Sequence, residues 1–259
     1  MPVLLFLGDI VGQETVDLIS LRMESIRSEI GVDWVVANAE NAANGSGLTP
    51  AQFRKLRDAG IDGITLGDHA LRKREISKTL DHETSICRPA NFPPDAPGRG
   101  WGIAKSPFGE ILHFTTVLGR TFMKPVDCPF RALDRILAQP VQNPWLVDIH
   151  AEATGEKVLL GQWLDGRVGA ALGTHTHIAT ADEVILPKGT AYLTDVGMSG
   201  PSQGVLGRKF ESILSTVLTG VQHPFEVARG NIVLCGALIE LNRNSGLADS
   251  IKRIRIPLG

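Results

Sequence analysis

The chain of 259 residues has few cysteines and no long apolar run. Its three cysteines, Cys87, Cys128 and Cys235, are far apart and form no CxxC pair, which argues against a disulfide framework and fits a reducing compartment. No stretch reaches the roughly 18 apolar residues that a membrane span needs. The short apolar start lacks the basic region of a signal peptide. We therefore expect a cytoplasmic protein with no membrane partner.

The chain also lacks a large excess of positive or negative charge, and it has few aromatic side chains. Lysine and arginine number 26 against 28 aspartate and glutamate residues, so the chain has no basic footprint for nucleic acid. Only 5% of the residues are aromatic, with a single tyrosine, which gives few platforms on which a long single strand could stack. A small ligand is therefore favoured over a long nucleic-acid strand, and RNA stays open without support from the charge.

Two common phosphate-binding motifs are absent as well. No GxGxxG follows the first apolar run, and GxxxxGK[ST] occurs nowhere in the chain. These absences count against a nucleotide-binding α/β domain without metals, which nevertheless remains an alternative from the residues alone.

What the sequence does contain is an alternation of strand and helix patterns. Continuous apolar runs predict strands, and apolar residues at helical spacing predict helices between them. We expect strands over 3–10, 33–41, 61–69, 110–119, 143–154, 167–178 and 189–201, helices over 14–30, 51–59 and 206–222, and a closing antiparallel pair over 231–242 and 250–258. For residues 203–230 we expect a helix that covers the rest of the domain, and the sequence suggests no further role for them. The absence of a repeat or linker predicts one α/β domain over residues 1–259.

Polar side chains follow several of these strands at the point where each strand ends. The loops beyond the carboxyl ends of strands converge in open α/β sheets, so these side chains are expected to meet. Each one alone has an ordinary explanation as a turn former, a helix cap or a core histidine. Five strand ends nevertheless each supply a side chain of a type that can bind a metal, which is a carboxylate, an amide or an imidazole. The candidate metal ligands are Asp9, Glu40, Asn41, Asp68, His150, His175 and His177, with His69 beside them.

The donor types in this set indicate the kind of metal. Carboxylate, amide and imidazole groups together suit Mn, Fe or Zn better than Ca. His175 and His177, two residues apart in "GTHTHI", are expected to share one face of a strand end. Glu40 has two carboxylate oxygens and can bridge two ions. A pair of ions about 3.5–4 Å apart can clamp a phosphate during in-line displacement.

Taken in order, the motifs around these residues resemble one known family. They are "GDIVG" (8–12), "NAENAANGSGLT" (38–49), "LGDH" (66–69), "RPANFP" (88–93), "LGRTFM" (118–123), "DIHAEATGEK" (148–157), "GTHTHIATAD" (173–182) and "GTAYLTDVGMSGP" (189–201). The set spans nearly the whole chain and is similar to the YmdB-type family of calcineurin-like metallophosphoesterases. "GTHTH" alone would indicate only the wider superfamily.

The resemblance implies a four-layer αββα sandwich with a dinuclear metal centre. It implies one ion held by Asp9, Glu40, Asn41 and His177, a second ion held by Glu40, Asp68, His150 and His175, and His69 as the general acid. The ions would be divalent or trivalent, with Fe or Mn expected and Zn open. The wider superfamily usually opens with Asp-x-His. This chain has Asp9-Ile10-Val11, and Asn41 is taken to fill the place of the missing histidine.

The implied function is a dinuclear-metal-dependent phosphodiesterase that hydrolyses small phosphodiesters such as 2′,3′-cyclic nucleotides. The ions would lower the pKa of a bridging water, the resulting hydroxide would attack phosphorus, and His69 would protonate the leaving oxygen. The Gly-rich segments 44–47 and 197–201 either offer backbone N–H groups to the phosphate or form ordinary turns. Two alternatives stay open: a phosphomonoesterase, and a metal-binding regulatory protein with weak or no catalysis. A homo-oligomer stays open too.

One residue departs from the family pattern. The family has Gly-Asn-His where this chain has Gly67-Asp68-His69. The aspartate adds a negative charge to a site that already holds Asp9 and Glu40, and it removes an NH₂ donor. We expect this site to hold cations more tightly and to repel a phosphodiester more strongly than the same site with asparagine at this position would. Residues 70–75, "ALRKRE", also differ from the Trp-Asp usual in the family, so the loop that faces the substrate is left unassigned.

Overall fold

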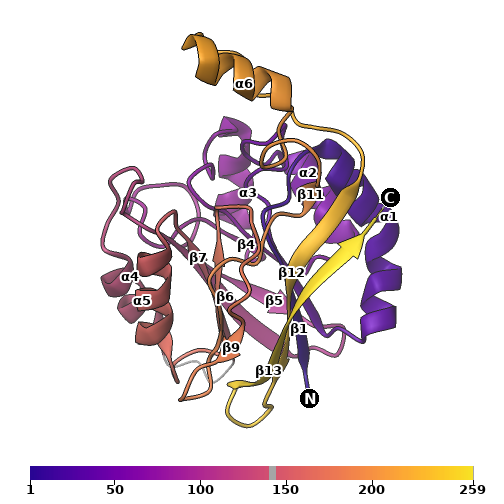
Figure 1. The fold of residues 1–259 in the computed structure, drawn as a ribbon. Coiled ribbons are helices and arrows are strands. Elements are labelled where there is room, and N and C mark those ends of the chain that lie inside the picture. Colours follow the sequence, from indigo (N-terminus) through magenta and orange to yellow (C-terminus); the bar gives the residue numbers. More distant parts are fainter. Residues whose placement is uncertain (140–143, 259) are drawn as a thin grey trace.

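Two stacked β-sheets form the centre of the molecule in a computed structural model that describes residues 1–139 and 144–258 (Figure 1). The first sheet is seven-stranded and contains β1 (Val3–Leu7), β2 (Trp34–Asn38), β3 (Gly63–Thr65), β4 (Ile86–Cys87), β11 (Gly200–Pro201), β12 (Ile232–Leu241) and β13 (Ala248–Pro257). The second is six-stranded and contains β5 (Trp101–Lys105), β6 (Ile111–Leu118), β7 (Trp145–His150), β8 (Ala170–Thr174), β9 (Val184–Ile185) and β10 (Ala191–Leu193).

The strand order places parallel strands at the centre of each sheet. The first sheet has the order β11-β12-β1-β2-β3-β4, with β13 paired to β12, and β1 to β4 run parallel. The second has the order β5-β6-β7-β8-β10-β9, in which β6, β7, β8 and β10 run parallel. Because parallel strands end on the same side, each sheet gathers several strand ends at one edge.

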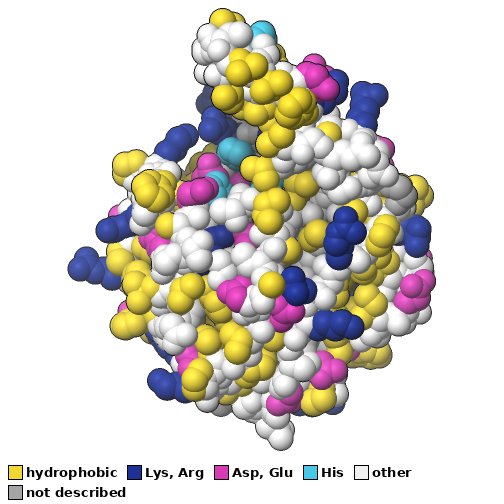
Figure 2. Space-filling model, viewed as in Figure 1, with side chains coloured by type: hydrophobic (Ala, Val, Ile, Leu, Met, Phe, Trp, Pro, Cys, Tyr) yellow, Lys and Arg dark blue, Asp and Glu magenta, His cyan; other side chains and the backbone are white. Residues whose placement is uncertain are grey.

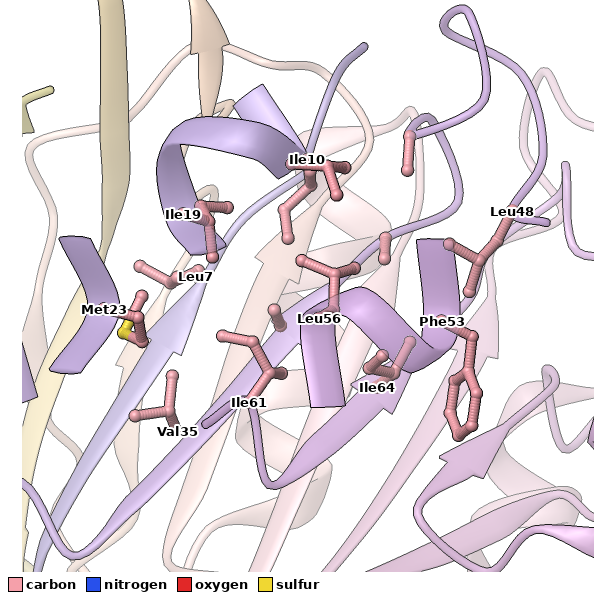
Figure 3. Packing of buried hydrophobic residues seen from close by; sticks show 14 of the residues in the cluster. Leu7, Ile10, Ile19, Met23, Val35, Leu48, Phe53, Leu56, Ile61 and Ile64 are labelled. Carbon is pink, nitrogen blue, oxygen red and sulfur yellow. The ribbon is translucent and has the colours of Figure 1, made fainter. Parts of the chain in front are cut away.

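Helices cover the outer face of both sheets, which gives four layers. The helices are α1 (Gln13–Ile30), α2 (Pro50–Asp58), α3 (Ser77–His82), α4 (Pro129–Leu137), α5 (Thr154–Leu164) and α6 (Phe210–Thr219), with a short 3₁₀ turn at Arg74–Ile76. Helices α1 and α2 pack on the first sheet, as Figure 3 shows for Ile19, Met23 and Leu56. Helices α4 and α5 pack on the second. The predicted αββα sandwich is confirmed.

Alternate side chains of β1 point to opposite faces of the first sheet, so this strand contributes to two hydrophobic cores. Leu5 and Leu7 point into the core shared with α1, and Leu4 and Phe6 point into the core between the sheets. Phe114 of β6 lies in the same inter-sheet core and is fully buried. Its ring leaves no room for a Cβ at Gly63 of the first sheet, so the two sheets approach closely there.

The predicted strands occur in the structure, and most of them are shorter than predicted. The strand predicted over 167–178 ends at Thr174. The one predicted over 143–154 runs over Trp145–His150, and residue 143 lies outside the described residues. The closing pair is confirmed as β12 and β13. Helices α3, α4 and α5 were not predicted. In α5, Gly155 and Gly161 interrupt the helical pattern.

The expectation of a covering helix within 203–230 is wrong. Helix α6 projects from the body of the molecule, and none of its described residues is buried (Figure 1). Apolar side chains lie on its surface, including Phe210, Val217 and Leu218, the last two about three quarters exposed (75% and 74%; Figure 2). The helix therefore adds nothing to the cores of the sandwich. Within the described residues, no helix combines the length and apolar character that crossing a membrane requires.

Replacing Phe114 by alanine should destabilise the fold strongly. Removing a fully buried ring between the sheets costs about 3–5 kcal/mol of unfolding free energy. Val217→Ala on the exposed side of α6 is the control, with an expected change below about 0.5 kcal/mol. Urea unfolding of the metal-free proteins measures both values. Equal midpoints for the two variants would contradict the four-layer packing.

Candidate metal centre

The carboxyl ends of strands from both sheets meet at one place. Asp9 follows β1, Glu40 and Asn41 follow β2, and Asp68 and His69 follow β3 in the first sheet; His150 ends β7, and His175 and His177 follow β8 in the second. Figure 2 shows histidine and acidic side chains side by side in a hollow beneath α6. The structure therefore brings together all eight residues that the sequence singled out.

Four of these residues form a tight group of donors. One donor atom each from Glu40, Asp68, His150 and His175 lies within 4.8 Å of the others. His150 Nε2 is 3.1 Å from Glu40 Oε1 and 3.4 Å from Asp68 Oδ1. His175 Nδ1 lies 3.0 Å from His150 Nε2. Two carboxylates and two imidazoles that converge in this way fit Mn, Fe or Zn.

A second group of donors surrounds the amide of Asn41. Asn41 Nδ2 is 3.5 Å from Asp9 Oδ1, 3.5 Å from Glu40 Oε1 and 3.4 Å from His177 Nε2. The oxygen and nitrogen of an amide are assigned from its hydrogen bonds, and rotating the group by half a turn would direct Oδ1 to the same three atoms. Oxygen and nitrogen donors again converge in this group. The Glu40 carboxylate takes part in both groups.

His69 lies at the rim of the two groups. Its backbone N–H donates to Glu40 Oε2 at 2.8 Å, and its Nδ1 is 2.8 Å from Asn41 Oδ1. Its Nε2 lies 3.7 Å from Asp68 Oδ2. The side chain is 26% exposed, so it can contact a molecule that enters the hollow.

The expectation that His175 and His177 share a strand face is wrong. Strand β8 ends at Thr174, and the two histidines follow in a turn with φ values of 93° and 67°. Positive φ is uncommon for residues other than glycine and requires support from surrounding structure. The turn directs His175 toward His150 and His177 toward Asn41.

A buried ion pair supports this turn, and the sequence had not indicated it. Lys157 of α5 donates to Asp195 Oδ2 at 2.7 Å and to the carbonyl of Thr174 at 2.8 Å. The same carboxylate oxygen accepts from the Thr176 hydroxyl at 2.6 Å. A lysine that is 1% exposed is rare unless it is paired. The only sequence signal was the motif "HAEATGEK", within which Lys157 had no assigned role.

The Gly-rich segments form ordinary turns in the structure. The N–H groups of Ser46 and Gly47 donate to the carbonyls of Ala43 and Glu40. In the second segment, Gly197 N–H donates to Asp195 Oδ1, and Met198 N–H donates to the carbonyl of His177. These backbone groups are used within the protein, which favours the turn interpretation over phosphate binding.

Burial and charge shift several pKa values in the metal-free centre. Burial raises the pKa of Asp9 to about 6, despite the opposing effect of His177. Burial acts against the charged forms of Glu40 and His150, but their mutual attraction outweighs it, so the pKa of Glu40 falls and that of His150 rises well above its usual value. Burial and the neighbouring charge of His150 lower the pKa of His175. One imidazolium thus neutralises part of the negative charge.

Metal binding should release protons and weaken in acid. Asp9 must ionise and His150 must lose its Nε2 proton before either can act as a ligand, so the metal competes with protons. We expect the affinity for Mn²⁺ or Zn²⁺ to fall as the pH drops through about 6. Calorimetric titration between about pH 5 and 8, in buffers of different ionisation enthalpy, measures affinity and proton release together. An affinity independent of pH would contradict the assignment.

Known proteins with similar sequences and structures support one family. The chain is 41% identical over 255 residues to the 2′,3′-cyclic-nucleotide 2′-phosphodiesterase of Bacillus subtilis, and the match covers 98% of this chain and 96% of that protein. A solved structure from Thermus thermophilus superposes with a TM-score of 0.92 at 41% identity and covers 98% of this chain and 99% of that one. A structure described as a novel phosphatase from Mycoplasma pneumoniae gives 0.91 at 31% identity and covers 99% and 93%. The model of the YmdB-like protein family matches residues 5–254, and the chain belongs to that family.

Proposed function

We propose that this protein hydrolyses small phosphodiesters such as 2′,3′-cyclic nucleotides with the help of two metal ions. The observation that carries the proposal is the pair of donor groups that share Glu40 and lie beside His69. The 41% identity to a 2′,3′-cyclic-nucleotide 2′-phosphodiesterase supports the substrate class. Fe or Mn is the proposed metal, and Zn also fits the donor set.

Each group of donors would hold one ion. Asp9, Glu40, Asn41 and His177 form the first set, and Glu40, Asp68, His150 and His175 form the second. When bound, such a pair of ions supplies an activated water and neutralises charge on the phosphoryl oxygens. The shared carboxylate of Glu40 would hold the two ions side by side.

His69 would donate a proton to the leaving oxygen. Its side chain is 26% exposed at the rim, and its Nδ1 is already occupied by Asn41 at 2.8 Å. Its Nε2 is therefore the nitrogen available to a substrate. Histidine is the side chain that most often acts as a general acid or base in catalysis. The backbone bond to Glu40 fixes its position relative to both donor groups.

Two measurements on this chain test the proposal directly. We expect two metal ions per chain after loading with Mn²⁺, and metal-dependent hydrolysis of bis-p-nitrophenyl phosphate that exceeds hydrolysis of the corresponding monoester. Two ions without turnover would favour the regulatory alternative. Faster hydrolysis of the monoester would favour a phosphomonoesterase. No bound metal after loading with Mn²⁺ or Fe²⁺ would refute the site itself.

His69→Ala should lower kcat on the order of 10²–10⁴-fold, because the leaving oxygen loses its proton donor. The metal content should stay unchanged, since His69 belongs to neither donor set. The matched control is His82→Ala, which removes an exposed histidine at the end of α3. Steady-state rates and metal analysis on the same samples distinguish the two effects. If His69→Ala kept the kcat of the parent, the proposal that His69 is the general acid would be wrong.

Asp68→Asn tests the departure from the family pattern. Asp68 Oδ1 lies 3.4 Å from His150 Nε2, so its charge acts directly on the second donor set. Removing that charge takes away about 1–4 kcal/mol of attraction for a cation, so the metal Kd should rise at least about fivefold. Turnover at saturating metal should increase, because repulsion of the phosphodiester falls. Equal rates and equal metal content for parent and variant would contradict this interpretation.

A further inference from the structure

The two histidines of the second donor set present different ring nitrogens to the proposed ion. His150 directs Nε2 toward Glu40 and Asp68, whereas His175 directs Nδ1 toward Asp68 and His150. A neutral imidazole has one N–H and one free lone pair, so ligation requires the proton on the other nitrogen of each ring. The partner of that other nitrogen decides whether the ring is ready to bind.

The free end of the His150 ring meets a chain of buried polar groups. His150 Nδ1 is 2.8 Å from Thr174 Oγ1, and the Thr174 hydroxyl donates to Asp148 Oδ1 at 2.6 Å. Since the only hydroxyl hydrogen goes to Asp148, the Thr174 oxygen is left to accept, and Nδ1 of His150 is the donor. The chain therefore favours a proton on Nδ1 and a free Nε2.

The Asp148 carboxylate is itself held in place on its other side. Its Oδ2 accepts from Thr65 Oγ1 at 2.6 Å and from Asn38 Nδ2 at 2.9 Å. With Thr174, three side chains donate hydrogen bonds to this one carboxylate, which therefore acts as the acceptor toward each of them. All four of these residues are buried, and they come from both sheets. The direction of the Thr174 hydrogen bond is thereby fixed.

The free end of the His175 ring meets a carboxylate directly. His175 Nε2 is 3.2 Å from Glu152 Oε2, which lies just after β7 and is about half exposed (49%). An acceptor at this position favours a proton on Nε2 and leaves Nδ1 free. This is the reverse of the arrangement at His150, and it matches the direction in which each ring faces the donor set.

We propose that Asp148, acting through Thr174, and Glu152, acting directly, are positioning residues that select Nε2 of His150 and Nδ1 of His175 as the metal-binding nitrogens. The inference rests on the proposed metal site at Glu40, Asp68, His150 and His175. Partners of metal-bound histidines of this kind typically change metal affinity by about 10–100-fold when they are removed.

The first test compares Thr174→Val with Thr174→Ser in the whole 259-residue chain. Valine keeps the branched shape of threonine but has no hydroxyl, whereas serine keeps the hydroxyl. We expect the Zn²⁺ affinity to fall about 10–100-fold in Thr174→Val and to stay within about threefold of the parent in Thr174→Ser. A Thr174→Val protein that folds and binds Zn²⁺ as tightly as the parent would overturn the role of the Asp148–Thr174 chain.

The second test uses Glu152, whose exposed position makes misfolding an unimportant risk. Glu152→Ala should weaken Zn²⁺ binding about 10-fold, and Glu152→Gln should restore part of it because the amide oxygen still accepts. Glu156→Ala is the matched control, since that carboxylate accepts from the backbone N–H groups of Arg120 and Thr121 instead. Equal affinities for Glu152→Ala and the parent would overturn the role of Glu152.

Nitrogen-15 NMR of the histidine rings in the Zn²⁺-loaded parent gives a readout that a merely structural role would not produce. We expect the proton on Nδ1 of His150 and on Nε2 of His175. The same tautomer in both rings would overturn the inference even if no variant folds. A parent that binds no Zn²⁺ would refute the proposed metal site as well, whereas a parent that binds Zn²⁺ alongside unaffected variants would refute the positioning role alone.

Discussion

The contact between Glu40 and His150 is the interaction on which the rest of the structure depends. Both side chains are almost fully buried, their donor atoms are 3.1 Å apart, and they come from different sheets. A buried charge without a partner is costly, so each group requires the other in the metal-free protein. The two sheets must therefore stack in one register for the charges to be compensated, and the same register assembles the centre.

The sequence predicted the strands and the composition of the site because both follow from local patterns, whereas the four-layer arrangement was implied by the family resemblance. Apolar runs identified the strands, and the polar residues at their ends identified Asp9, Glu40 and Asp68. Family resemblance, rather than any local pattern, divided the residues into two sets. The prediction that His175 and His177 share a strand face was wrong, because both residues lie in a turn with positive φ. A motif this short does not distinguish a strand end from such a turn.

The supporting residues could not be predicted, because their partners are remote in sequence. Thr174 lies 24 residues from His150, and Lys157 lies 38 residues from Asp195. Before the strands are placed, a buried lysine looks like any surface lysine. The orientation of α6 was missed for a related reason: an apolar helical pattern predicts a packed helix, and only the fold shows that none of the residues of this helix is buried.

The position of β12 has a consequence for how the chain is made on the ribosome. β1 lies between β2 and β12, yet β12 is synthesised about two hundred residues after β1. All strands of the second sheet, by contrast, come from one continuous stretch, 101–193. During synthesis the second sheet can be complete while β1 still exposes an unpaired edge, which is the kind of surface that associates with other nascent chains. Strand β12, which is synthesised late, therefore pairs with the edge of β1, which is synthesised early.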